Sequence, residues 1–245
     1  MESNRCFLGL CRKESKNRWN HAAEITCVGI VVRLWQVRTV KRLKSSQMTT
    51  RVALGGFEPN DQESGGRWTQ FNLNFVGPAL FSSAYKLDLH ESFIRIGFIT
   101  EKDPYILPND QPPGFREGLW RADCGELWLA NPGSVRYLEI NLAPNGDWWA
   151  CVFSSPRTRD FGTEPPQCST ENFVSANAWY VWINLPKAEI ERCLGTSENL
   201  VGNVTLVLGG CDHPDEKLEN LHSIVQLGAH DFHRPQDWVP LSNLI

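Results

Sequence analysis

Tryptophan, carboxylate and amide side chains alternate closely between residues 120 and 149. The residues there that could do chemistry are Trp120, Arg121, Asp123, Glu126, Glu139, Asn145, Trp148 and Trp149, and Trp182 adds another indole ring downstream. Planar aromatic faces beside a few hydrogen-bonding groups are the general form of a small-molecule pocket. The pattern therefore predicts a site for a carbohydrate, or for a similar small polar ring compound, that binds its ligand without catalysis.

The tryptophan side chains could bind a ligand at such a site or pack in the hydrophobic core. Trp148 and Trp149 are neighbours, so on a strand they point to opposite sides of the sheet, and we expect at least one of them to leave the core. That indole, with Trp120 or Trp182, is expected to clamp a pyranose ring. Hydrogen bonds to the ring hydroxyls are expected from Arg121, Asp123, Glu126, Glu139 and Asn145. The alternative is that the indoles pack between two sheets, because large aromatic side chains dominate sandwich cores.

Short strands must position these residues. Apolar and polar residues alternate at 71–75, 85–89, 94–98 and 126–129, which is the pattern of half-buried strands. Residues 179–185 and 204–208 predict two more strands. A hairpin is predicted where the turn Pro144-Asn145-Gly146 joins 137–142 to 147–153.

One short helix is predicted near residues 186–194. Pro186 fits a first helical position, Ile190 and Leu194 are four residues apart on one face, and Gly195 is placed to end the helix. Many short strands with so little helix predict an all-β fold. We expect an antiparallel β-sandwich of the immunoglobulin-like or jelly-roll-like type.

Two motifs carry a resemblance to a known family. The order W-x-x-D-x-x-E-L-W-L from Trp120, followed by Y-L-E-I-N-L-A-P-N-G-x-W-W from Tyr137, resembles DOMON-like domains and the related family 9 carbohydrate-binding modules. The stretch 230–235 is similar to the D-F-H sequence that closes many DOMON-like chains. The resemblance covers about residues 69–238 and implies an antiparallel β-sandwich without catalytic machinery. Arg121 and Cys124 depart from the pattern, which leaves the ligand open.

The charge of the chain is unevenly distributed. Residues 1–47 hold ten Lys and Arg against three Glu, whereas residues 48–245 hold fourteen against twenty-five Asp and Glu. The basic segment could serve nucleic acid or an anionic membrane surface. We instead expect residues 1–47 to be a disordered leader or a gene-model extension, and residues 48–245 to form the sandwich domain, with no nucleic-acid or membrane partner.

The sequence predicts a cytoplasmic location. The apolar run at 25–32 is about eight residues long, whereas a membrane-spanning helix needs about 20. No small-residue cleavage site follows the basic segment, which disfavours a secretory signal. The eight cysteines have irregular spacing, which favours reduced thiols over a disulfide framework.

Other functions are weaker alternatives. Exposed aromatic side chains could instead anchor a protein partner. Haem binding, which occurs in some DOMON-like branches, would need axial His or Met ligands, and the only methionines are Met1 and Met48. We expect neither a cofactor nor a metal, although Asp212, His213, Asp215, His230, Asp231 and His233 crowd into the last third. A glycoside-acting enzyme would need paired carboxylates, for which Asp123, Glu126 and Glu139 are candidates.

Overall fold

The computed structural model describes residues 68–71, 81–209, 220–229 and 231–245 of the chain. The predicted leader at 1–47 and most of the predicted strand at 71–75 lie outside the described residues. His213 and His230 also lie outside them. No helix within the described residues is long and apolar enough to cross a membrane.

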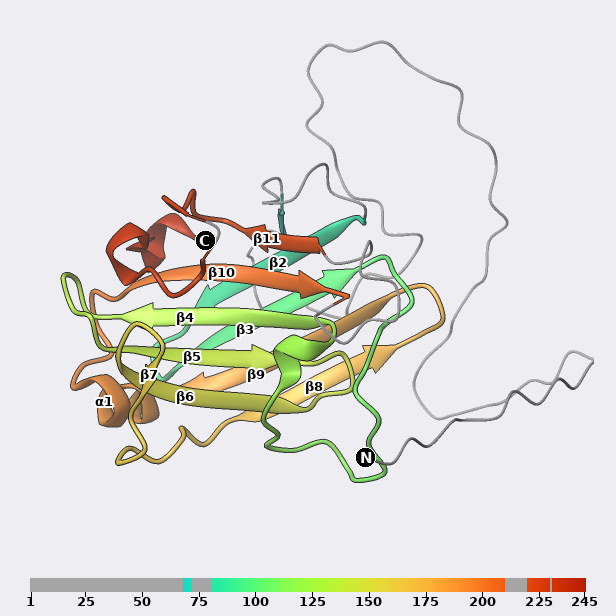
Figure 1. The fold of residues 1–245 in the computed structure, drawn as a ribbon, viewed down its shortest axis with the longest axis horizontal. Coiled ribbons are helices and arrows are strands. Elements are labelled where there is room, and N and C mark those ends of the chain that lie inside the picture. Colours follow the sequence, from blue (N-terminus) through green and yellow to red (C-terminus); the bar gives the residue numbers. More distant parts are fainter. Residues whose placement is uncertain (1–67, 72–80, 210–219, 230) are drawn as a thin grey trace, which may run out of the picture. The chain divides into compact units, whose positions relative to one another are not determined.

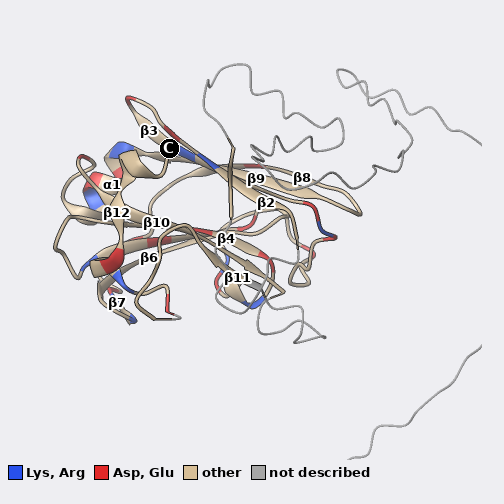
Figure 2. Ribbon diagram, turned by 90° about the horizontal axis from the view of Figure 1, so that it is seen from above, with Lys and Arg blue, Asp and Glu red and all other residues tan. Residues whose placement is uncertain are grey.

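Twelve strands of the described chain form two antiparallel sheets. The five-stranded sheet has the order β1 (Thr69–Gln70), β2 (Ser83–Leu89), β3 (Phe93–Thr100), β9 (Trp179–Pro186) and β8 (Ser169–Val174). The seven-stranded sheet has the order β11 (Asn220–Ser223), β10 (Val201–Leu208), β4 (Cys124–Ala130), β5 (Tyr137–Leu142), β6 (Trp148–Ser155) and β7 (Thr158–Arg159), with β12 (Val239–Pro240) paired to β10. Figure 1 shows one sheet behind the other, and Figure 2 shows them as two layers. The predicted antiparallel β-sandwich is confirmed.

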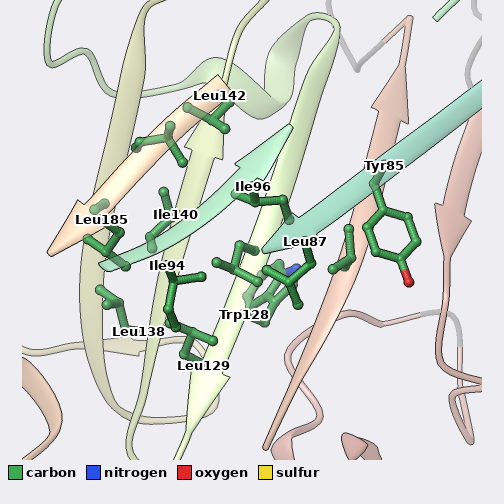
Figure 3. Packing of buried hydrophobic residues seen from close by; sticks show 14 of the residues in the cluster. Tyr85, Leu87, Ile94, Ile96, Trp128, Leu129, Leu138, Ile140, Leu142 and Leu185 are labelled. Carbon is green, nitrogen blue, oxygen red and sulfur yellow. The ribbon is translucent and has the colours of Figure 1, made fainter. Parts of the chain in front are cut away.

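The core lies between the two sheets. Leu138, Ile140 and Leu142 occupy alternate positions of β5, as the sequence predicts, and they face Ile94 and Ile96 of β3 across the core (Figure 3). All five side chains are essentially inaccessible to solvent. Burying such side chains contributes roughly 1.5–3 kcal/mol each, so this layer fixes how the sheets pack.

The predicted helix is present as α1 (Lys187–Leu194). It begins directly after Pro186, where β9 ends, and it buries Ile190 and Leu194 against the core. Gly195 adopts φ 84°, and its N–H donates a hydrogen bond of 2.7 Å to the carbonyl of Glu191. A left-handed residue in this position is the usual helix ending and favours glycine.

The outer face of the seven-stranded sheet is also covered. The alternation in β5 predicts that Tyr137, Glu139 and Asn141 form the face away from the core, yet they are only 0%, 5% and 0% exposed. The 3₁₀ helix η1 (Leu119–Arg121) and residues 231–238 lie over this face. Both faces of this sheet are therefore buried, and the outer one is lined with polar and aromatic side chains.

The sequence pattern does not predict β7, β8, β11 or β12, and β8 is the longest of these strands. Most side chains of β8 are exposed, and its sequence S-T-E-N-F-V has no apolar alternation. It lies at the edge of the five-stranded sheet, where polar residues oppose aggregation through the unpaired strand.

Gly125 provides a test of the packing between the sheets. A Cβ atom there would lie 2.4 Å from Cγ of Phe98, a side chain fully buried in the core. Gly125→Ala should lower the free energy of unfolding by about 1–3 kcal/mol, because overpacking forces buried side chains and backbone apart. Urea unfolding measures the change. The matched control is Gly114→Ala, where the nearest atom to the added Cβ is 3.9 Å away; an equal loss in both variants would contradict this account.

Candidate functional site

A cavity of ≈ 430 Å³ opens on the outer face of the seven-stranded sheet. It is lined by Trp120, Glu126, Trp128, Glu139, Trp149, Phe153, Arg157, Arg159, Val207, Leu221, Asp231, Phe232 and His233. Strand register explains the grouping, because directly paired residues of neighbouring strands share a face. Trp128 pairs with Glu139, and Phe153 pairs with Arg159. The strands thus supply the floor, and η1, the β6–β7 turn and residues 231–233 supply the walls.

Indole rings form one wall of the cavity. The rings of Trp120 and Trp149 meet edge to face, with centroids 5.2 Å apart and planes at 64°. The guanidinium of Arg159 lies 5.1 Å from the Trp149 ring centroid and 5.8 Å from that of Trp120, and it also pairs with Glu117 at 2.5 Å. A cation and the face of an indole ring attract each other electrostatically. The guanidinium of Arg159 therefore stabilises the positions of the Trp120 and Trp149 rings.

Glu126 reaches the cavity at the end of a hydrogen-bonded chain. The indole N–H of Trp128 donates to Oγ1 of Thr205 at 2.7 Å, and the Thr205 hydroxyl donates to Oε2 of Glu126 at 2.6 Å. Burial raises the pKa of Glu126 to about 7, although the bonds from Thr205 and Trp128 oppose the change. A carboxyl group with this pKa exists in both protonation states near neutral pH.

Glu139 is the second buried carboxyl group. Its Oε1 accepts a hydrogen bond of 3.1 Å from Nδ2 of Asn141. Its Oε2 is buried and has no hydrogen-bond partner within the described residues, and the same holds for Oδ1 of Asn141. Burial, followed by the charge of Glu126, holds the pKa of Glu139 well above its usual range. Two buried oxygens on this face of the sheet therefore have unused hydrogen-bonding capacity within the described residues.

The opposite wall is a polar network from two loops. His233 Nδ1 lies 2.6 Å from the Tyr137 hydroxyl, and Nη2 of Arg157 donates to Oδ1 of Asp231 at 2.8 Å. The Arg157 backbone N–H donates to the Tyr137 hydroxyl at 3.2 Å, and Arg157 has φ 61°. Burial, aided by the nearby Arg157 charge, lowers the pKa of His233 to about 4, so its ring is neutral at physiological pH. This network fixes residues 231–233 over the sheet.

Four predicted site residues meet in the cavity: Trp120, Glu126, Glu139 and Trp149. Trp149 is 4% exposed, and its ring lies on the cavity side of β6, which places Trp148 on the other side. Trp148 packs instead against Phe115 with centroids 5.0 Å apart. Trp149 thus faces the cavity from the outer side of the sheet, but it stays buried and packs with the core residues, whereas Trp148 is only partly buried.

Asp123 and Asn145 have structural partners and do not line the cavity. Asp123 is fully buried, where it accepts hydrogen bonds from Nζ of Lys102 at 2.6 Å and from the backbone N–H of Gly209 at 2.7 Å. Asn145 donates to Oδ2 of Asp147 at 2.8 Å within the β5–β6 turn. The two side chains hold loops to the sheet.

The structure does not bring Trp182 and Arg121 into the cavity. Trp182 lies over Gly97 on the outer face of the five-stranded sheet, with Arg95 4.7 Å from its ring centroid. The core separates this face from the cavity, so the expected clamp between Trp182 and Trp149 does not form. Arg121 is exposed at the end of η1.

The sequence analysis did not assign the remaining lining residues to this site, although it singled out Asp231 and His233 as possible metal ligands. Trp128 is two residues from Glu126 and therefore on its face, and Phe153 is four residues from Trp149. These two could have been found from strand alternation. Arg157, Asp231 and His233 come from loops, whose approach to the sheet depends on tertiary packing.

Among the described residues, no cluster of three or more His, Cys, Asp or Glu has a metal-binding arrangement. Cys124, Cys151, Cys168 and Cys193 are free thiols. Burial raises the pKa of all four, well above the usual range for Cys124.

Comparison with known proteins supports the fold. No protein-family model matches the chain, and no curated protein does. Among solved structures, a Bacteroides uniformis protein described as a putative carbohydrate-binding protein matches with TM-score 0.53 and 13% identity, over 71% of this chain and 84% of that one. A family 9 carbohydrate-binding module from Caldicellulosiruptor kristjanssonii, in complex with glucose, matches with TM-score 0.50 and 9% identity, over 74% and 86%. The chain shares the β-sandwich fold of these proteins.

Glu126 should make stability depend on pH. Its pKa is about 7 in the folded chain against an ordinary 4.5, so between these values the unfolded chain has lost a proton that the folded chain keeps. Stability therefore falls as pH rises through this window. The parent protein should therefore be less stable at pH 8 than at pH 5. In Glu126→Gln this difference in unfolding free energy should be smaller by on the order of 2 kcal/mol.

Urea unfolding at pH 5, 6, 7 and 8 measures this dependence. Glu198→Gln is the control, because that side chain is 70% exposed and pairs only with Lys187 at the surface. A pH profile for Glu126→Gln that matches the parent protein would show that Glu126 is ionised in the fold.

Proposed function

We propose that the cavity on the outer face of the seven-stranded sheet binds a carbohydrate, or a similar small polar ring compound, without catalysis. The observation that carries this proposal is the meeting of the Trp120 and Trp149 indoles with the buried carboxyl groups of Glu126 and Glu139 in one cavity. A sugar ring has apolar C–H faces and an equator of hydroxyl groups. The indole rings can stack against the C–H faces of the sugar, and the carboxyl groups can form hydrogen bonds with its hydroxyls.

The size and polarity of the cavity support this class of ligand. A volume of ≈ 430 Å³ lies within the range of about 300–1,000 Å³ that small-molecule sites occupy. The carboxyl groups of Glu126 and Glu139 line the cavity, and each can accept a hydrogen bond when ionised and donate one when protonated, as sugar hydroxyls also can. A ligand hydroxyl that pairs with either carboxyl group adds a hydrogen bond to a largely buried polar group.

The structural neighbours add independent support. The Caldicellulosiruptor kristjanssonii module, which shares this fold, is described in complex with glucose. The proposal extends to this chain the general property of sugar binding. The contacts of the ligand are argued from the residues of this cavity alone.

A glycan-binding screen by calorimetry on the full chain tests the proposal. Trp120→Ala and Trp149→Ala should each weaken binding of the recognised sugar at least about 10-fold, because aromatic anchors at the centre of a binding site commonly carry 2 kcal/mol or more. Trp148→Ala is the matched control: the residue adjoins Trp149 on the same strand but packs against Phe115. Unfolding curves establish that each variant folds.

Three results would contradict this assignment. Unchanged affinity in both cavity variants would remove the aromatic wall from the site, and absence of binding to every glycan would favour a protein partner. Turnover of a glycoside that disappears in Glu126→Gln would show an enzyme in place of a binding module.

A further inference from the structure

Two of the three carboxyl groups that line the cavity, those of Glu126 and Glu139, have no cationic partner among the described residues, whereas Asp231 pairs with Arg157. Glu126 accepts its hydrogen bond from the Thr205 hydroxyl, and Glu139 accepts from the Asn141 amide. Neither carboxyl group forms an ion pair within the described part of the chain, and Glu139 Oε2 has no hydrogen-bond partner there. Two acidic groups thus lie in one buried site with only neutral donors.

The guanidinium groups nearby are already paired elsewhere. Arg157 pairs with Asp231 at 2.8 Å, and Arg159 pairs with Glu117 at 2.5 Å while it lies over the indoles. Their charges attract Glu139 from a distance. Neither supplies the direct contact that would neutralise a buried carboxylate.

The other titratable groups that face the pair are neutral near pH 7. Burial raises the pKa of the Cys124 and Cys151 thiols and of the Tyr137 hydroxyl, so all three keep their protons. His233 has lost its proton because its pKa is about 4. Among the described residues, none of these groups can therefore add positive charge to this part of the cavity by titration near neutral pH.

A buried carboxylate is costly unless it is paired and hydrogen-bonded. In the empty cavity, the pair can reduce this cost by keeping a proton. A ligand with an ammonium group can replace that proton, since it brings both the compensating charge and up to three N–H donors.

We propose that the cavity is selective for a cationic ligand, namely an amino sugar or a similar ring compound that carries an ammonium group, with Glu139 and Glu126 as its counter-ions. This inference rests on the proposed function of the same cavity and narrows its ligand class. The ammonium group lies against the carboxyl pair, and the ring lies against Trp120 and Trp149.

Matched sugars test the role of the charge. Calorimetry on the full chain at pH 6.5 compares glucosamine, galactosamine and mannosamine with their parent sugars and with their N-acetyl forms, which keep the nitrogen but lose its charge. Each amino sugar forms a set with its parent sugar and its N-acetyl form. In at least one set the amino sugar should bind at least about 10-fold more tightly than both neutral forms, because hydrogen bonds to charged groups contribute roughly 1.5–3 kcal/mol.

Variants and a measurement of proton release test whether the preference for amino sugars depends on the carboxyl groups of Glu126 and Glu139. Glu139→Gln should remove the preference for the amino sugar while the neutral sugar still binds, and Glu198→Gln should preserve it. At pH 7, titrations in buffers of different ionisation enthalpy should show a proton passing from the carboxyl pair to the buffer when the amino sugar binds. Glu139→Gln should reduce this release.

The outcomes separate the two proposals. Neutral sugars that bind as tightly as the amino forms in every set would overturn the cationic selectivity and leave carbohydrate binding intact. A preference that persists in Glu139→Gln would place the ammonium group elsewhere and would also overturn it. Failure of all the sugars to bind would reject both proposals.

Discussion

The burial of the outer face of the seven-stranded sheet is the constraint on which the site depends. A sandwich usually leaves that face to solvent, but here η1 and residues 231–238 pack over it. The contact between Trp128 and His233 and the 2.6 Å hydrogen bond between Tyr137 and His233 attach the second segment to the sheet. Covering the sheet turns ordinary strand positions into a cavity and removes water from its acidic side chains.

Desolvation then determines the chemistry of the cavity. On an open sheet, Glu126 and Glu139 would be solvated, ionised and without special affinity for a ligand. Under the loops, they favour the protonated form and retain unused lone pairs. The neutral state of His233 and the pairing of Arg157 with Asp231 follow from the same packing. Their fixed positions would lower the entropic cost of binding the proposed ligand.

The fold could be predicted from the sequence because strand alternation is a local property. Leu138, Ile140 and Leu142 lie in the core, and Gly195 ends the helix, where the sequence predicts them. The edge strand β8 escaped prediction because neither of its faces is consistently apolar. Trp120, Glu126, Glu139 and Trp149 meet in the cavity because η1 and three adjacent strands bring them there.

The rest of the site depends on contacts that no local pattern encodes. Asp123 has the residue type of a ligand-binding carboxylate, yet its oxygens are occupied by Lys102 and Gly209. Glu139 resembles a solvent-facing acid, yet it is buried with an unpaired oxygen. What distinguishes the two carboxylates is whether the fold satisfies their hydrogen bonds. A buried carboxylate with its partners already in place holds the structure together, whereas Glu139 lines the cavity with one oxygen unpaired among the described residues.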